Sequence, residues 1–158
     1  MELQTVKEWI DDFYGFDSFL KEKEEQKELS LRTFFMSQPV GEGINIEHGK
    51  RMREKFQGDF IRFSGYNRMT DGTVASTKGD LLEPYEGTDM HCSIQVDYPM
   101  IEKEVQLADE NGFRYSLHAQ GDGAVHKVAG IFDKCQKKDG KLVNRHAVTD
   151  MEFPIRQI

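Results

Sequence analysis

The stretch Leu117–Val125, with the sequence LHAQGDGAV, joins a strand-like run to a helix-like run. Residues 113–117 before it are aromatic and partly alternating, and apolar residues after it recur at helical spacing, at Val125, Val128, Ala129 and Phe132. A histidine at the end of a strand, followed by Gly-Asp-Gly opening a helix, is typical of the functional edge of parallel α/β folds. On residue type alone, His118 fits an ordinary hydrogen-bonded loop histidine equally well.

Apolar periodicity and turn residues predict the elements on either side of this stretch. We expect helices over residues 3–24, 46–56 and 123–137, and a further helix that opens at Asp97-Tyr98-Pro99 and stops at Gly112. Strands are expected near residues 31–37, 60–69, 113–119 and 142–149. Residues 70–95 have no helical period, which predicts a long loop that is a lid, a binding loop or disordered. Strands alternating with helices predict a parallel sheet with right-handed crossovers.

Length and composition narrow the classes of function. The chain has 158 residues and a formal net charge of −7, which suits one domain and argues against a nucleic-acid partner. No apolar run is long enough for a membrane span, and the N-terminus lacks the pattern of a signal peptide. The two cysteines, Cys92 and Cys135, have no metal-knuckle spacing and are expected to be free thiols. We therefore expect a cytoplasmic protein.

Four segments together resemble one known family. They are HAQGDGAV at 118–125, LRTFFM at 31–36, the run from Ile61 that includes DGT at 71–73 and LLEPY at 81–85, and RHAV at 145–148. In this order they resemble the metal-dependent amidohydrolases, in the YtcJ-like branch that includes N-substituted formamide deformylases. The resemblance covers roughly residues 25–154.

The resemblance implies a (β/α) barrel, and a complete barrel of this kind needs about 250 residues. The expected fold is therefore α/β, a partial TIM barrel of about four parallel strands with flanking helices. Residues 1–158 are expected to be a single segment from the central part of such a barrel. Its expected partners are the remainder of the barrel or a second copy, because half a barrel leaves strand edges and apolar helix flanks uncovered.

The resemblance also implies a divalent-metal centre, with zinc the expected ion, at the carboxyl end of the strands. The family's metal ligands include a carboxylated lysine on a middle strand and one histidine on each of the next two strands. The lysine falls on Asn67, the first of these histidines on His118 and the second on Asp150. Asparagine has no amine to carboxylate, and Asp150 replaces a nitrogen ligand by an oxygen ligand. Asp122 is expected to cap a helix or support the ligands from behind, and His146 to pack or hydrogen-bond beneath the site. The family's HxH pair and last aspartate have no counterpart in the segment.

Two functions from different classes remain open. The first is a metal-dependent hydrolase acting on a carbon–nitrogen bond of a small amide or formamide, of which this segment alone binds metal weakly and is inactive. The second is a non-catalytic relative that binds a ligand or a protein, because the lysine and one histidine are replaced. A sequence of no present function is a third reading. The substrate itself is not encoded in these motifs, because the loops that shape the pocket vary freely on this fold.

Overall fold

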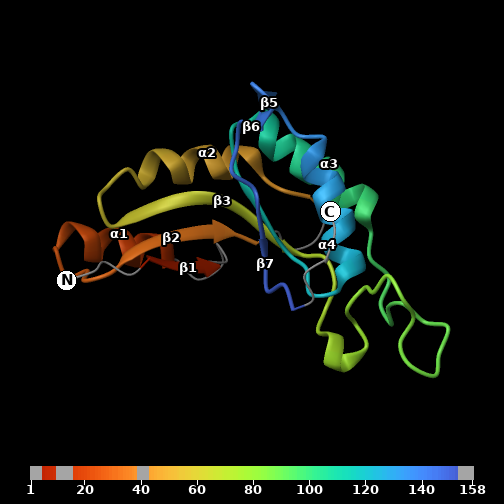
Figure 1. The fold of residues 1–158 in the computed structure, drawn as a ribbon. Helices are drawn as coiled ribbons and strands as arrows, with labels where there is room; N and C mark the ends of the chain where they lie inside the picture. Colours follow the sequence, from red (N-terminus) through yellow and green to blue (C-terminus); the bar gives the residue numbers. More distant parts are fainter. Residues whose placement is uncertain (1–4, 10–15, 39–42, 153–158) are drawn as a thin grey trace. The chain divides into compact units, whose positions relative to one another are not determined.

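A computed structural model describes residues 5–9, 16–38 and 43–152 of the chain, which divides into two compact units, residues 1–67 and 68–158. Each unit is α/β, with parallel strands and flanking helices, so the expected fold class is confirmed and is compatible with part of a (β/α) barrel (Figure 1). Within the described ranges, no helix combines the length and the apolar character needed to cross a membrane.

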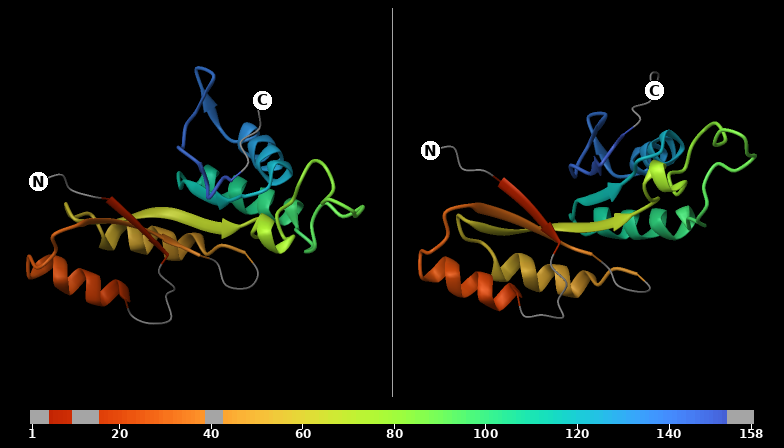
Figure 2. Two further views of the ribbon diagram at one scale, coloured as in Figure 1. Left: turned by 60° about the horizontal axis from the view of Figure 1, so that its bottom comes forward. Right: turned by 90° about the horizontal axis from the view of Figure 1, so that it is seen from below.

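The first unit alternates strands and helices in the order β1 (Thr5–Trp9), α1 (Phe16–Glu25), β2 (Arg32–Ser37), α2 (Ile46–Lys55) and β3 (Ile61–Met69). The strands lie side by side in the order β1-β2-β3, and both pairs are parallel. Thr5 pairs with Arg32 and Thr33 with Ile61, with an irregularity between Phe35 and Ser37. Figure 2 shows α1 and α2 together on one face of these strands, as parallel crossovers require.

Aromatic side chains fill the space between these strands and α2. Phe35 of β2 meets Phe56, just after α2, at 5.0 Å, and Phe63 of β3 at 5.4 Å, both edge to face. Asn45 caps α2 by accepting the His48 N–H, and the Tyr66 hydroxyl donates to the Asn45 carbonyl. The expected helix over residues 46–56, with Met52 and Phe56 facing inward, is confirmed.

The expected helix over residues 3–24 is wrong in its first part. Thr5–Trp9 is a strand, and the helix begins at Phe16, while residues 10–15 lie outside the described ranges. Apolar residues at Val6 and Trp9 fit helical spacing, but a short run does not separate the two periods. The edge of β2 offers backbone partners to this segment, and its β-branched and aromatic residues suit a strand.

The second unit begins with the end of β3 and continues through α3 (Tyr98–Glu110), β4 (Tyr115–His118), α4 (Asp122–Asp133) and β7 (Ala147–Thr149). β4 and β7 are parallel, with Ser116 opposite Ala147 and His118 opposite Thr149. α3 opens as expected, because Asp97 accepts the Met100 N–H and Pro99 lies in the first turn. α3 packs against α4 and against β4. The buried apolar residues of the two helices include Ile101, Val105, Ala108, Val128, Ile131 and Phe132.

Residues 70–97 form the expected long loop, whose one described regular element is a short 3-10 turn, η2 (Val74–Ser76). The loop connects the end of β3 to the start of α3. Its ordering comes from side-chain contacts to the β4–α4 turn, which belong to the candidate site below.

Two expected boundaries near the C-terminus are wrong. α4 ends at Asp133 rather than 137, and the expected strand 142–149 is split into β6 (Lys141–Leu142) and β7. β6 pairs antiparallel with β5 (Lys137–Lys138) around Asp139-Gly140, both of which have positive φ. Two such residues favour a tight hairpin, which takes up the end of the expected helix and the start of the expected strand.

Candidate functional site

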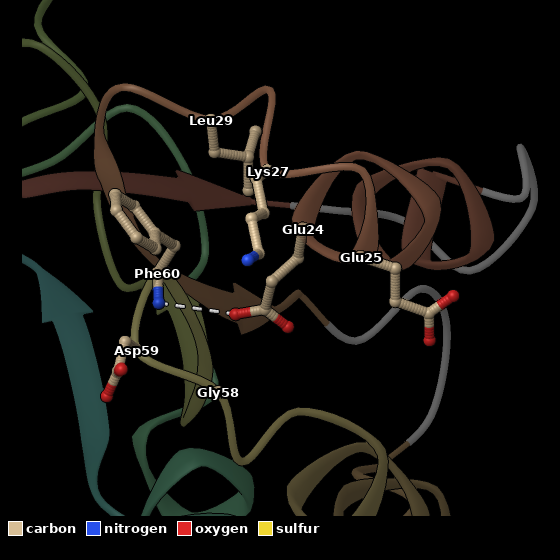
Figure 3. A pocket seen from close by; sticks show the side chains of 7 residues that line it. All are labelled: Glu24, Glu25, Lys27, Leu29, Gly58, Asp59 and Phe60. Carbon is tan, nitrogen blue, oxygen red and sulfur yellow. Dashed lines mark hydrogen bonds between the residues drawn. The ribbon is translucent and has the colours of Figure 1, made fainter.

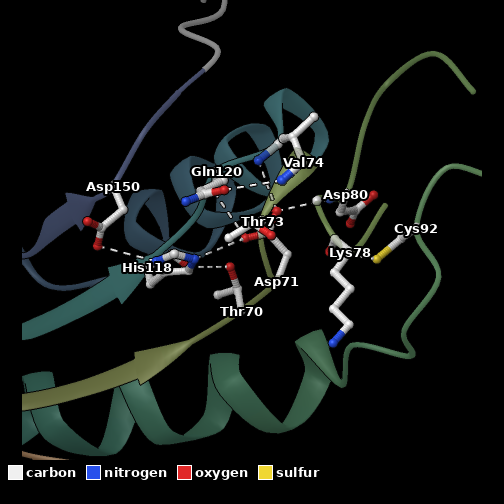
Figure 4. Close-up of polar contacts among 12 residues, drawn as sticks. Thr70, Asp71, Thr73, Val74, Lys78, Asp80, Cys92, His118, Gln120 and Asp150 are labelled. Carbon is white, nitrogen blue, oxygen red and sulfur yellow. Dashed lines mark hydrogen bonds and ion pairs between the residues drawn. The ribbon is translucent and has the colours of Figure 1, made fainter. Parts of the chain in front are cut away.

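His118 lies at the carboxyl end of β4, where its ring meets a carboxylate that follows β7. The Nδ1 atom lies 3.3 Å from Oδ2 of Asp150 (Figure 4). Only 7% of the His118 side chain is exposed, against 51% of the Asp150 side chain. Asp150 has φ of +60°, a conformation that aspartate adopts more readily than most residues. Two of the three predicted metal ligands therefore meet at one strand end.

The second ring nitrogen of His118 is buried and has no hydrogen-bond partner among the described residues. The carboxylate oxygen that faces it is Oδ1 of Asp71, at 4.0 Å. That distance is too long for a hydrogen bond. An unpaired polar atom in a protein interior costs free energy, so its presence needs an explanation. The Nδ1 atom of His118 thus contacts Asp150, whereas the buried Nε2 atom has no hydrogen-bond partner among the described residues.

Asp71 is a site residue that the sequence analysis did not single out, although it stands in the quoted run Asp71-Gly72-Thr73. Its side chain is fully buried and accepts three backbone N–H groups. Gln120 donates to Oδ1 at 3.0 Å, while Asp80 and Gly121 donate to Oδ2, both at 2.9 Å. One carboxylate therefore joins the long loop to the β4–α4 turn. An aspartate directly after a strand and before a long loop is the signal that marks it.

The long loop lies so close to this turn that only glycine fits at positions 121 and 123. A Cβ added at Gly121 would overlap the backbone of Asp80, and one at Gly123 would press on the same carbonyl. The Asp80 carbonyl also accepts the Ala124 N–H at the start of α4. Asp122 accepts the N–H groups of Leu82 and Gly123. The two glycines of the Gly-Asp-Gly motif thus let the loop pack closely against the turn, and the aspartate between them bonds to the loop.

The Asp80 side chain meets one partner from α3 and one from α4. Its Oδ2 accepts the Tyr98 hydroxyl at 2.6 Å and the Lys127 ammonium at 2.5 Å. The same ammonium lies 4.7 Å from the centre of the Tyr98 ring. Burial, followed by the bond to Asp80, raises the pKa of the Tyr98 hydroxyl, which stays protonated at neutral pH. These contacts line a hollow of about 340 Å³ together with His91 and Cys92.

The other predicted residues have clear places in the fold. Asn67 lies near the end of β3 and is fully buried. It is the last residue of the first unit, so its part in the site stays a prediction. Asp122 is the first residue of α4 rather than its cap, which is Gly121, and it holds the long loop. His146 lies at the opposite end of β4 from His118. Its Nδ1 accepts the Tyr115 N–H at 3.0 Å.

His146 belongs to a second cluster of metal-ligand types, in which atoms of Asp109, Cys135 and His146 lie within 4.8 Å of one another. By spacing alone this triad suits a metal. However, Nδ1 of His146 accepts a backbone proton, so the neutral ring carries its own proton on Nε2, which lies 3.0 Å from Asp109. Because that nitrogen is a donor, it has no lone pair for a metal. The hydrogen bonds therefore favour a structural network.

The first unit has a hollow of its own, of about 450 Å³, at the amino end of β3 (Figure 3). Glu24 points into it from the end of α1, and Oε1 accepts the N–H groups of Phe60 and Ile61. The glutamate thus satisfies backbone groups at the start of β3. Its role is structural, and no other described contact there points to chemistry.

Comparison with known proteins gives a match of fold. No protein-family model matches the sequence, and no curated protein matches it. Among solved structures, the chain is similar to an uncharacterized metal-dependent hydrolase from Pyrococcus furiosus, with a TM-score of 0.59 and 21% identity over 83% of this chain and 26% of the other. It is also similar to an uncharacterized metal-dependent hydrolase from Pyrococcus horikoshii OT3, with a TM-score of 0.57 and 20% identity over 82% and 25%. The chain spans about a quarter of the length of these structures.

Proposed function

We propose that the chain forms the central part of a metal-dependent hydrolase of the amidohydrolase type, which cleaves a carbon–nitrogen bond of a small amide or formamide. The observation that carries the proposal is the buried Nε2 atom of His118 at the carboxyl end of a parallel strand, which has no hydrogen-bond partner in the part of the chain that the structure describes. Active sites of (β/α) barrels form at this end of the strands. The fold shared with two metal-dependent hydrolases supports it.

The residues at this strand end fit part of a metal centre. His118 would bind the cation through Nε2, because its Nδ1 is held by Asp150. A divalent cation bound there supplies Lewis acidity for the amide carbonyl and activates water at neutral pH. The Asp150 carboxylate contacts Nδ1 of the ring, and the Thr70 hydroxyl donates to the backbone carbonyl of His118 and so holds the end of β4. A ring held in this way does not need to reorganise when it binds.

The same residues leave the centre incomplete. Catalytic zinc is usually held by three protein ligands, and Asn67 has no amine that could carry a bridging carbamate. The site proposed here therefore holds a single cation rather than a pair. We further propose that residues elsewhere in the complete barrel supply the missing ligands and cover the outer edge of β7.

A non-catalytic relative is the second candidate, and the substitution at Asn67 is the observation that favours it. A buried neutral amide replaces the family's charged lysine, so the chain retains the fold with a reduced ligand set. On this reading the long loop and the β4–α4 turn form a ligand-binding or interaction surface without turnover.

Metal content and turnover of the full-length protein test the proposal. We expect bound divalent metal and hydrolysis of simple N-formyl or N-acyl compounds, with both lost in His118→Ala. The matched control is His126→Ala, because His126 is an exposed histidine on α4 of the same unit. A full-length protein without metal would contradict the enzyme reading and favour the non-catalytic one. Metal and turnover that persist in His118→Ala would contradict the role given to this residue.

A further inference from the structure

We infer that a divalent cation binds between His118 Nε2 and Asp71 Oδ1, and that Asp150 is a positioning residue rather than a ligand. The inference rests on the proposed function and names the ligands of the same site. It differs from the ligand set implied by the family resemblance, in which Asp150 takes the place of a histidine ligand and Asp71 has no role.

The first step concerns the tautomer of His118. Asp150 is the group that contacts Nδ1, and an ionised carboxylate only accepts hydrogen bonds. The proton of the neutral ring therefore lies on Nδ1, and Nε2 presents a lone pair. This nitrogen is buried and has no donor to satisfy it among the described residues. A ring whose one nitrogen donates to a carboxylate while the other is free is the usual arrangement of a metal-binding histidine.

The second step concerns the lone pairs of Asp71. An ionised carboxylate offers about four acceptor positions, two on each oxygen. The Asp80 and Gly121 N–H groups use both positions on Oδ2, whereas Gln120 uses one on Oδ1. One position remains, and it belongs to the oxygen that faces His118. Two acceptors thus face each other in a buried place, an arrangement that a cation between them would stabilise.

The third step concerns distance and chemistry. The Nε2 and Oδ1 atoms are 4.0 Å apart. A tetrahedral zinc ion with bonds of about 2.0–2.2 Å holds two ligand atoms about 3.4 Å apart, so the two side chains would approach each other by roughly 0.6 Å to share a cation. One imidazole nitrogen and one carboxylate oxygen suit zinc or manganese better than calcium. The 51% exposed Asp150 lies on the opposite ring nitrogen, where it orients the ring without reaching the cation.

Zinc titration of the 158-residue chain, followed by calorimetry and by nitrogen NMR of the histidine ring, tests the inference. We expect one zinc ion per chain, at least a 100-fold weaker association in His118→Ala, and a 10- to 100-fold weaker association in Asp150→Asn. His126→Ala should bind as the unaltered chain does. Zinc should move the Nε2 resonance of His118 and leave Nδ1 protonated.

Asp71 is tested without a substitution, because Asp71→Asn replaces one of its two acceptor oxygens by an NH2 group that would face backbone N–H donors, which endangers folding. The backbone amide signals of Gln120 and Gly121 report on the carboxylate that they contact, so zinc should move both. If zinc moves His118 but neither amide, Asp71 is not a ligand and the inference is overturned. Unchanged binding in Asp150→Asn likewise overturns the positioning role.

Two further outcomes separate this inference from the proposed function. If the chain binds zinc at His118 and Asp71 but the full-length protein hydrolyses nothing, the cation site stands and the hydrolase proposal fails. If Nε2 of His118 carries a proton that zinc does not displace between about pH 6 and 8, the cation site is overturned, and turnover by the full-length protein still decides the hydrolase proposal.

Discussion

Two buried histidines at opposite ends of β4 differ in what their ring nitrogens contact. His146, at the amino end, has both nitrogens engaged, and its ring stacks on Phe132 at 5.0 Å. His118, at the carboxyl end, has one nitrogen beside Asp150 and one with no partner among the described residues. The exposed fractions of the two side chains, 0% and 7%, barely separate them. Hydrogen-bond satisfaction, rather than burial, distinguishes the structural histidine from the candidate functional one.

The largest effect is expected at the His146 end, in Asp109→Ala. Asp109 accepts hydrogen bonds from Gln136, Asn144 and His146, so alanine would remove the acceptor of the Gln136 N–H and of the buried His146 Nε2, whereas Asn144 also donates to the Asp109 carbonyl. We expect the free energy of unfolding, measured with urea, to fall by about 3 kcal/mol or more. The control is Asp133→Ala, which removes an exposed pair with Lys137 and should change little. A loss no greater than in the control would contradict the structural reading of this cluster.

A smaller loss is expected at the His118 end from Gly121→Ala. The new Cβ would overlap the Asp80 backbone, so the long loop must move away from the turn. We expect about 2 kcal/mol of destabilisation and weaker zinc binding, because the same movement disturbs the bonds to Asp71. Gly130→Ala on α4 is the matched control, since nothing lies near its Cβ and alanine favours helix by about 0.5–1 kcal/mol.

Acid should weaken the His146 end in a defined direction. Burial alone would raise the pKa of the Asp109 carboxyl, but the hydrogen bonds from Asn144, Gln136 and His146 hold it below its ordinary value of 3.8. A depressed pKa in the folded state stabilises the protein above pH 3.8, and this contribution is lost as the pH falls through the folded value. Urea unfolding at several pH values below about 5 should show a steeper loss in the unaltered chain than in Asp109→Asn. Parallel curves would rule out this contribution.

The cysteines should separate the structural cluster from the loop by their reactivity. Burial, and then the nearby Asp109 carboxylate, raise the pKa of the Cys135 thiol to about 11, so little thiolate forms near neutral pH. Cys92 lies in the long loop and is partly exposed. At about pH 8, a thiol reagent should modify Cys92 in the folded protein and Cys135 only after unfolding. Equal rates at both positions would show that the cluster opens readily.

The smallest effect on stability is expected from His118→Ala. The ring makes one long contact to a half-exposed carboxylate, and its Nε2 has no partner among the described residues, so its removal loses little hydrogen bonding and mainly the packing of a buried ring. We expect the free energy of unfolding to fall by about 1–2 kcal/mol, clearly less than in Asp109→Ala. A loss as large as that one would mean that His118 is structural, and the contrast between the two ends of β4 would disappear.

The sequence predicted most of the fold, and the errors have physical causes. β2, β3, β4, α2 and α3 follow from apolar periodicity and capping residues, which act locally. The strand Thr5–Trp9 was missed because it depends on pairing with β2, which lies far away in the sequence. The start of β7 was placed too early for a similar reason. Asn144 and His146, which precede β7, are held by the distant Asp109 rather than by a strand partner.

The sequence names candidate site residues where a motif marks them, and the geometry adds one residue that no motif assigned. His118 and Asp150 were placed by resemblance, and the structure brings them to 3.3 Å. Asp71 stood in the quoted DGT run but was given no role, because that role depends on backbone N–H groups of Asp80, Gln120 and Gly121 that only the fold brings together. That His118 Nε2 has no partner among the described residues is likewise a property of packing, and no residue pattern encodes it.

The three backbone bonds of Asp71 also bear on the entropy of ligand binding. If a loop of this length became ordered only when a ligand bound, the conformational entropy that the loop lost would weaken the binding. Here the segment around Asp80 is fastened to the β4–α4 turn when the chain folds. A ligand arriving at His118 would meet a surface whose shape is already set, so it would lose mainly its own translational and rotational freedom.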